Sequence, residues 1–493
     1  RVLHWLYVAE SEEDMLVRLQ CIRSLVYRNP KNVREMEAVA GFDLLGFFLK
    51  SKRKLLSIDI VMCLFEICGV ASDHGTIVNN LRAFRYIFLD LDIWRGTSVE
   101  VCQFVWRMML GVVSTCTFAA FNRQRLRKFH MYFVLLNILQ DGAFEAVHNL
   151  VLKCLIAFMS DFHSNELYAT VEFINYTIYQ PSMVGGGRQG QRIVARSTTT
   201  ARQTPVPGSQ RLLEEVREKL LEHILALLGA SKEEKKLDVF VKAFDMPFLL
   251  ALADAFIPET TVQLALRLLC TLALLRTSVI AKLRSNSVIC SLQSILSRRA
   301  DSDFAYYYCF CLLLNKPTWE IAPEPISIAY ADLCTSFDVE QVKVSCPEVL
   351  FVIFELLHRS CESSLRMVIN DLESDDLIHH RRIQASIYQF LQFLVDHNSD
   401  IAEAFHRTEY LEAFVEALFF EGSLHIAPVP KFNAYGSLSL SSTKSSSPLG
   451  AGNSQRDMLA DFLPGLEREV MADDFGDLET PPPPMGAEPS KKV

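Results

Sequence analysis

The chain has 493 residues, half of them apolar and 22% charged, which is enough apolar material for a large core. Its net charge of −9 argues against general nucleic-acid binding, which needs a basic surface. The 13 cysteines lie mostly inside apolar runs such as LFEIC and YYYCFCLLL and form no Cys-x-x-Cys pair. We therefore expect reduced core cysteines in a cytosolic protein, without a structural metal site. The longest strongly apolar stretch without charge, residues 108–122, is too short to span a bilayer.

Helical periodicity runs through the chain, and strand signals are scarce. In DMLVRLQCIRSLV, from Asp14 onward, apolar residues recur at steps of three and four, as on one face of a helix. Three stretches that begin at Ser24, Thr271 and Phe393 align without a gap and agree at five apolar positions. The matching residues are Leu25, Leu272 and Leu394; Met36, Leu283 and Phe405; Phe42, Ile289 and Leu411; Leu45, Leu292 and Phe414; and Leu49, Leu296 and Leu418.

Each of the three stretches predicts the end of a helix, a polar break, a short helix, a second break and another helix. Helical runs next to them recur after about 41 residues. Repeats of this length, built from two or three helices, are typical of HEAT and armadillo arrays. The sequence therefore predicts an all-α, armadillo- or HEAT-like helical solenoid.

Two polar regions interrupt or end this array. Residues 181–210 are rich in Gly, Ser, Thr, Arg and Pro, and residues 434–493 contain a Ser-rich run, an acidic peptide and four prolines in sequence. Such segments bury too little apolar surface to offset their chain entropy. We predict armadillo-like repeats at 1–180 and 211–433, a disordered internal linker at 181–210, and a disordered acidic, Pro-rich tail at 434–493.

A basic cluster in FNRQRLRKFHMYF is the first candidate for a binding surface; it consists of Arg123, Arg125, Arg127 and Lys128. One interpretation is a solvated turn before a helix that begins at Phe129. The other is a surface that contacts anionic lipid headgroups or an acidic partner, where each charge near a membrane contributes about 1 kcal/mol. Trp94 and Trp106, nearby in the chain, are expected to be core residues between stacked helices.

The same region resembles a known family. The runs LLSIDIVMCLFEICG, NNLRAFRYIFLDLDIWRGTSVEVCQFVWRMM and RKFHMYFVLLNILQDG are similar to the armadillo-like region upstream of the BEACH domain in large BEACH proteins, such as the neurobeachins and the WD-repeat and FYVE-domain BEACH scaffolds. The resemblance covers residues 1–180, and the remainder by architecture only. It implies a piece of a large cytosolic scaffold used in membrane traffic or selective autophagy, and it assigns no functional residue.

Short enzyme patterns occur without the parts they need. DFG at 474–476 and VGGGRQGQR at 184–192 match kinase fragments, but no H-R-D catalytic loop is present and only 17 residues follow the DFG. No G-x-S-x-G, H-E-x-x-H or P-loop occurs. We expect no enzyme, no cofactor and no metal. The predicted function is a protein–protein scaffold; the alternative is an armadillo-type adaptor or regulator that docks a kinase, a GTPase or a cytoskeletal partner.

The acidic tail carries the second candidate site. Phe475 and Leu478 are an aromatic and an aliphatic residue three positions apart, with Asp473 and Asp474 before them. This spacing suits an extended peptide that adds to a sheet edge of a ubiquitin-like autophagy modifier. The alternative is a solubilising tail. Expected partners are therefore proteins on the solenoid surface, with peripheral contact to anionic membrane as a further expectation and no nucleic acid. The expected location is the cytoplasm, peripherally on endomembranes.

Overall fold

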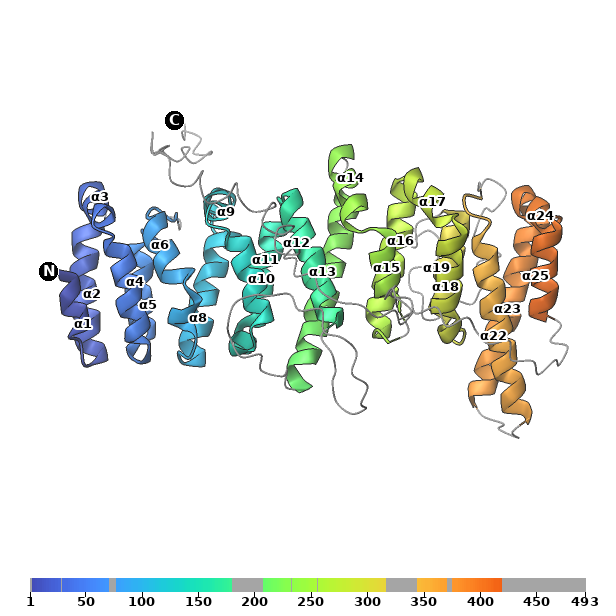
Figure 1. Ribbon diagram of the computed structural model, residues 1–493, viewed down its shortest axis with the longest axis horizontal. Coiled ribbons are helices and arrows are strands. Elements are labelled where there is room, and N and C mark those ends of the chain that lie inside the picture. The colour runs from blue at the N-terminus through green and yellow to red at the C-terminus, as the bar shows by residue number, and fades with distance from the viewer. Residues whose placement is uncertain are drawn as a thin grey trace, which may run out of the picture. The chain divides into compact units, whose positions relative to one another are not determined.

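The computed structural model describes residues 2–27, 29–70, 77–179, 207–231, 233–254, 256–315, 344–369 and 375–418. These residues belong to one compact unit, Arg1–His425. Every regular element among them is a helix, and no strand occurs within these ranges (Figure 1). The predicted all-α solenoid is confirmed.

The described part of the chain before residue 180 consists of helices joined by short connections. They are α1 (Val2–Tyr7), α2 (Glu12–Val26), α3 (Pro30–Ala38), α4 (Gly41–Ser51), η1 (Arg53–Leu55), α5 (Ile58–Ile67), α6 (Leu81–Phe88), α7 (Leu91–Trp94), α8 (Val99–Leu110), the π-helix η2 (Gly111–Thr115), α9 (Ala119–Arg127), α10 (Met131–Gln140), η3 (Gly142–Val147), α11 (His148–Met159) and α12 (Ser164–Tyr179).

The helices after residue 206 continue this order. They are α13 (Pro207–Ala230), α14 (Glu234–Ala243), α15 (Met246–Leu252), α16 (Glu259–Leu275), α17 (Thr277–Leu283), α18 (Asn286–Leu296), η4 (Ser297–Arg299), α19 (Asp303–Leu314), α22 (Val349–Ile369), α23 (Asp375–His397), α24 (Ser399–Phe405) and α25 (Thr408–Leu418).

The long helices form a continuous row in chain order (Figure 1). Each helix of this row packs against the next one, and the members are α2, α5, α8, α11, α13, α16, α19 and α22. A second row packs alongside it, through contacts of α4 with α6, α10 with α12, α12 with α14, and α15 with α18. The repeated packing of one unit on the next is what defines a solenoid.

The three stretches that align in sequence have the predicted structure. The segment α2–α3–α4, the segment α16–α17–α18 and the segment α23–α24–α25 each consist of a long helix, a short helix and a further helix. The polar break before the short helix is a capping site: Asn29 accepts a hydrogen bond from the N–H of Asn32, and the equivalent Asn398 accepts one from Ile401. Asparagine at this position satisfies a free N–H of the first turn.

Most of the matching apolar residues whose burial the structure describes are buried, and two of them are exposed. Phe42, Ile289, Leu45 and Leu292 lie in the core. In contrast, Leu25 is 48% exposed and Leu411 is 50% exposed. These two residues lie in the first and last of the aligned units, where fewer neighbouring helices are available to cover them. The matching of apolar residue types therefore predicted the helices correctly and overestimated burial at the two ends.

Trp94 and Trp106 are core residues, as expected, and both are almost fully buried. The indole of Trp94 is stacked on Phe88 with ring centroids 5.6 Å apart, and its N–H donates to the backbone oxygen of Ile87. Close packing at this end also requires Gly46 on α4, because a Cβ at Gly46 would lie 2.5 Å from the backbone oxygen of Tyr86 on α6. The close approach of α4 to α6 joins the first group of helices to the second.

One predicted boundary differs from the structure, and two predicted segments lie wholly or largely outside the described residues. Helix α13 begins at Pro207, so residues 207–210 are helical although the sequence placed them in the linker. Proline suits the first turn of a helix, where its missing N–H costs no hydrogen bond. The rest of the predicted linker and the whole predicted tail lie outside the described residues.

One described helical run is long and apolar enough to cross a membrane, although no spanning segment was expected. This run is Gly142–Met159, which comprises η3 and α11. Half of it is buried within the helical stack, as is usual for a core helix, so it is weak evidence for a span.

Candidate functional site on the basic edge of the first helical units

A basic hollow lies where α4 ends and η1 begins. Four of the five residues from Lys50 to Lys54 are cationic. They line an open depression of about 670 Å³ together with a few neighbours; the lining residues are Ala9, Glu10, Lys50, Ser51, Lys52, Arg53, Lys54 and Leu55. Cations are favoured at this place because the carboxyl end of a helix carries a partial negative charge. Glu10 is the one acidic residue among those lining the hollow.

The cations of the hollow are only partly engaged by the rest of the protein. Arg53 donates from a guanidinium nitrogen to the backbone oxygen of Arg95, 3.3 Å away. The Lys52 ammonium lies 6.0 Å from the centre of the Tyr7 ring, at the limit of a cation–π contact. Lys54 is exposed and makes no ion pair with any residue that the structure describes. The hollow therefore presents positive charge that the described part of the chain leaves uncompensated.

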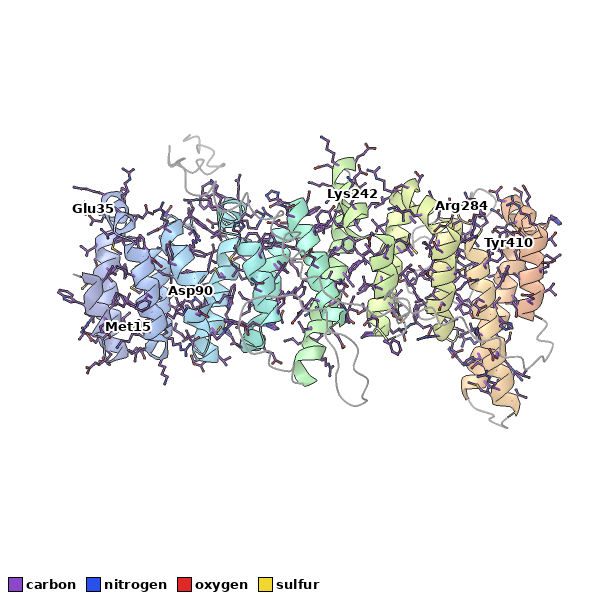
Figure 2. The ribbon with its side chains drawn as sticks, in the orientation of Figure 1. Met15, Glu35, Asp90, Lys242, Arg284 and Tyr410 are labelled. Carbon is purple, nitrogen blue, oxygen red and sulfur yellow. The ribbon has the colours of Figure 1, made fainter. Side chains whose placement is uncertain are left out.

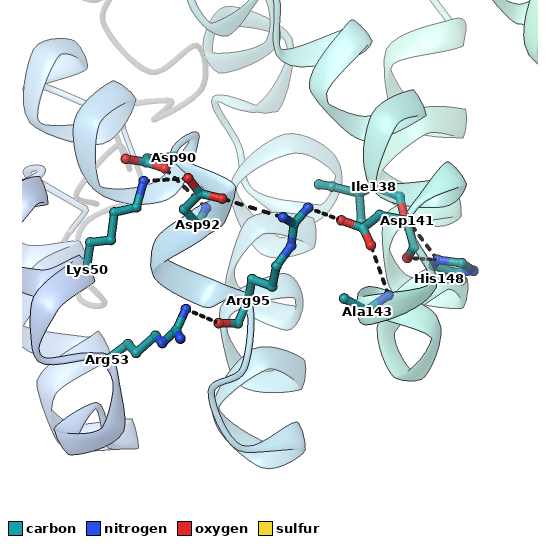
Figure 3. Close-up of polar contacts among 9 residues, drawn as sticks. All are labelled: Lys50, Arg53, Asp90, Asp92, Arg95, Ile138, Asp141, Ala143 and His148. Carbon is teal, nitrogen blue, oxygen red and sulfur yellow. Dashed lines mark hydrogen bonds and ion pairs between the residues drawn. The ribbon is translucent and has the colours of Figure 1, made fainter. Parts of the chain in front are cut away.

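An ion-pair ladder extends from the hollow across the next two groups of helices (Figure 3). Lys50 pairs with Asp92, Asp92 lies 3.7 Å from Arg95, and Arg95 pairs with Asp141. The first and last of these pairs join residues 42 and 46 positions apart, which is close to the predicted repeat length. The ladder thus uses equivalent positions of successive units.

The ladder orders charges without adding much stability. Its hydrogen bond to Asp92 raises the pKa of Lys50, and the same hydrogen bond lowers the pKa of Asp92. The four ladder side chains are 25% to 50% exposed. Exposed ion pairs contribute about 0–1 kcal/mol each. Since each acid of the ladder faces a base, the ladder is balanced in charge and the basic hollow at its end is not.

His148 contacts the turn at the far end of the ladder, where Asp141 lies. Its Nε2 lies 3.0 Å from the backbone oxygen of Ile138 and 3.3 Å from that of Asp141 (Figure 3). Burial lowers the pKa of His148, which favours a neutral ring that donates from Nε2 to these carbonyl groups. This residue holds the turn that carries Asp141 and offers no acid–base group to solvent.

The basic cluster predicted from the sequence has a different environment. Arg123, Arg125 and Arg127 lie in helix α9, where a solvated turn was one of the two interpretations. Arg127 pairs with Glu166 at 2.8 Å and donates to the backbone oxygen of Phe158 at 2.7 Å. Both members of this pair are largely buried, at 11% and 6% exposure of their side chains. The turn interpretation is therefore wrong for these three arginines, because α9 continues through them, whereas Lys128 does lie in the turn before α10.

The other two arginines also bond to neighbouring groups of helices. Arg123 donates to the backbone oxygen of Val113 at 2.8 Å and pairs with Asp161 at 2.7 Å. Arg125 donates to the backbone oxygen of Val78 at 2.7 Å. Lys128 is the member of the cluster that is exposed and has no ion pair within the described ranges. Contact of this cluster with lipid or an acidic partner stays a prediction, with three of its four charges already bonded inside the protein.

Arginine contacts of this kind recur further along the chain. Arg276 donates to the backbone oxygen of Glu234, and Arg299 donates to that of Ile257, in each case 42 positions away. Arg217 is almost fully buried and donates to the Thr261 hydroxyl, 44 positions away. Because the separations match the repeat length, these arginines join successive units.

The other predicted site cannot be placed. Phe475, Leu478, Asp473 and Asp474 lie outside the described residues. Within the described part of the chain, no group of three or more His, Cys, Asp or Glu side chains is arranged to hold a metal ion. The described cysteines are free thiols, and burial raises the pKa of Cys102 to about 11, so this thiol stays protonated.

The basic hollow was missed in the sequence, although a signal for it exists. Four cations among five residues, at 50–54, is a denser cluster than four among six, at 123–128. The cluster at 50–54 also lies at the end of a predicted helix, so its cationic side chains are close together at that end. Charge density combined with position relative to a helix end would have selected it.

Three known proteins are similar in sequence to parts of this chain, and they belong to one class. No protein-family model matches the chain. Protein SPIRRIG of Arabidopsis thaliana is 20% identical over 398 residues, which is 66% of this chain and 11% of SPIRRIG. Beige protein homolog 1 of Schizosaccharomyces pombe is 25% identical over 177 residues, 34% of this chain and 7% of that protein. WD repeat- and FYVE domain-containing protein 4 of Mus musculus is 22% identical over 272 residues, 53% of this chain and 8% of that protein.

These relatives are BEACH-domain-containing proteins, so the chain has a distant and partial similarity to that class. It spans between 7% and 11% of the length of the relatives it matches. Among solved structures, a crystal structure of an engineered protein covers 85% of this chain with a TM-score of 0.29 and 12% identity, which is too low to support an argument about fold or function.

Proposed function

We propose that this chain is a non-enzymatic helical scaffold that binds partner proteins, and that the basic hollow is one of its contact surfaces. The observation that carries the proposal is the row of four cations at 50–54, three of them exposed and Lys52 half-buried, on the edge of a continuous helical stack. Solenoids bind through extended surfaces of this kind. The fitting partner is an acidic peptide segment, because the hollow contains one carboxylate against four cations.

The ladder beside the hollow supports this choice of partner. Asp92 compensates Lys50, which leaves Lys52, Arg53 and Lys54 to attract an anion. The donated hydrogen bond from Arg53 to Arg95 fixes the guanidinium against the next group of helices without neutralising it. The charge is thus both held in place and available, which favours specific contact over diffuse attraction.

The similarity to BEACH-type proteins supports a finer proposal. We infer that this armadillo-like segment belongs to a large BEACH-type protein that acts in vesicle trafficking or selective autophagy, in the cytoplasm and peripherally on endomembranes. The support is the match over 398 residues to SPIRRIG and the shorter matches to the Beige homolog and the WD-repeat and FYVE-domain protein. The internal symmetry of the helices at a repeat of about 41 residues agrees with an armadillo-like array.

Proximity labelling by the native protein in its own cells tests the proposal. The hollow variant carries Lys52→Gln, Arg53→Gln and Lys54→Gln, and the control variant carries Lys235→Gln, Lys236→Gln and Lys242→Gln on α14. The control removes the same charge from exposed lysines elsewhere, one of which, Lys242, is labelled in Figure 2.

We expect the hollow variant to lose a defined set of labelled trafficking or autophagy proteins while the control variant keeps them. Identical labelling by the two variants would remove the hollow from the proposal. A lost set made of kinases, GTPase regulators or cytoskeletal proteins would instead support the alternative adaptor function.

A further inference from the structure

Helix α2 exposes an apolar stripe at the amino-terminal end of the array. Val17, Cys21 and Leu25 are four positions apart and therefore lie on one face of the helix. Val17 is 58% exposed, Leu25 is 48% exposed, and Cys21 is also exposed. Met15, labelled in Figure 2, is a buried residue of the same helix. We call Val17, Cys21 and Leu25 the end stripe.

The internal repeat shows how the same face behaves in the interior of the array. Extending the gapless alignment back along α2 and α16 places Leu264, Leu268 and Leu272 at the positions of Val17, Cys21 and Leu25. Leu268 and Leu272 are fully buried, and Leu264 packs partly buried against the core. Equivalent residues thus differ in exposure although the helices have the same place in their units.

Helix α23 supplies a second comparison. The equivalents of Cys21 and Leu25 there are Phe390 and Leu394, both fully buried, while the equivalent of Val17 is the half-buried polar residue Ser386. In both units a preceding helix packs against the helix that carries this face: α16 contacts α13, and the ring of Phe390 on α23 packs edge-on against Phe310 of α19, with ring centroids 4.8 Å apart. A preceding helix therefore lies against this helix position in both comparisons.

No comparable helix covers the end stripe within the described residues. The one described helix before α2 is α1, which has six residues. Other apolar side chains of the same end are exposed as well, including Trp5 at 56% on α1 and Phe47 at 62% on α4. Exposed apolar side chains at the end of a repeat array favour a capping partner, because terminal repeats normally present a polar outer face.

We infer that the end stripe is an interface for a further helical unit of the same kind. A long amphipathic helix that precedes Arg1 in the native polypeptide lies along Val17, Cys21 and Leu25, as α13 lies along α16. The lengths of the matched relatives agree with this, since the chain corresponds to at most 11% of them. This inference concerns the extent of the array and does not depend on the proposed partner of the basic hollow.

The thiol of Cys21 reports directly on whether the stripe is covered. Both Cys21 and Cys290 are exposed in this chain, so maleimide should label both, with peptide mass spectrometry reading each site. In the native full-length protein we expect labelling of Cys21 to slow by about tenfold or more while that of Cys290 is unchanged. Equal rates of Cys21 labelling in the two proteins would overturn the inference.

A substitution in the stripe and the oligomeric state separate the possible occupants. In the native full-length protein, Leu25→Asp should return the labelling rate of Cys21 toward that of the 493-residue chain. Light scattering should find the 493-residue chain monomeric. A dimer that Leu25→Asp dissociates would also overturn the inference, because a second copy would then be the occupant of the stripe.

Discussion

Two basic segments of this protein have similar compositions and opposite environments. The segment 50–54 spans the end of α4, and its cations line an open hollow. The arginines of the segment 123–128 lie in α9 and bond to carbonyl and carboxylate oxygens of the helix groups on both sides. The difference is one of position: a cation within a helix that lies between two units meets their helix ends, whereas a cation beyond a helix end meets solvent.

This comparison separates stability from binding. The arginines of α9 should contribute to folding because their partners are buried and would otherwise be left without a hydrogen bond. The cations of the basic hollow should contribute little to folding because their surroundings are solvated. Substitutions in the two segments should therefore differ in which property they change.

The largest expected effect is that of Arg127→Ala. This substitution removes the partner of Glu166, whose side chain is 6% exposed, and the hydrogen bond to Phe158. A buried charge left without its partner costs about 3–5 kcal/mol, so the free energy of unfolding should fall by about 3 kcal/mol. Urea denaturation followed by circular dichroism measures it. Lys128→Ala, the matched control, should change this free energy by less than about 0.5 kcal/mol.

Arg125→Ala should have an intermediate effect. The substitution removes one hydrogen bond from a charged donor to the backbone oxygen of Val78. It also removes a cation–π contact with Phe121, whose ring centre is 5.4 Å away. Hydrogen bonds to charged groups contribute about 1.5–3 kcal/mol, which predicts a loss of about 2 kcal/mol in the same denaturation experiment. An unchanged unfolding midpoint would show that α9 is not joined to the preceding unit through this residue.

A pH titration sharpens the comparison, because arginine stays charged while His148 does not. Burial lowers the pKa of His148 in the folded protein, so the unfolded chain binds the proton more readily. Stability should be constant above the unfolded value of about 6.5 and decrease as the pH falls below it. The variant His148→Gln, which keeps a donor for the carbonyl groups, should show a shallower decrease. Parallel curves for the two proteins would contradict this role.

The smallest expected effect on folding is that of the hollow variant. Replacing Lys52, Arg53 and Lys54 by glutamine should change the free energy of unfolding by less than about 0.5 kcal/mol, since none of the three has a buried ion-pair partner among the described residues. A loss comparable to that of Arg127→Ala would mean that the two segments have the same structural role.

The sequence predicted the helices well and the use of the charges poorly. The gapless alignment identified α2–α3–α4, α16–α17–α18 and α23–α24–α25, because apolar spacing and the asparagine caps are local properties. Exposure of Leu25 and bonding of Arg127 depend on which helix lies beside them, and a local pattern does not contain that information. The basic hollow depends less on distant neighbours, so its charge density could have identified it.

The most direct test of the central claim is an equilibrium titration of an acidic peptide. A fluorescein-labelled peptide of alternating glutamate and glycine is titrated with the unsubstituted chain, the hollow variant and the control variant, with fluorescence anisotropy as the readout. We predict that the hollow variant binds about tenfold or more weakly than the unsubstituted chain, that the control variant binds as the unsubstituted chain does, and that added salt weakens the binding. Equal weakening in both variants, or no difference among the three proteins, would contradict the claim that the basic hollow is a partner-binding surface.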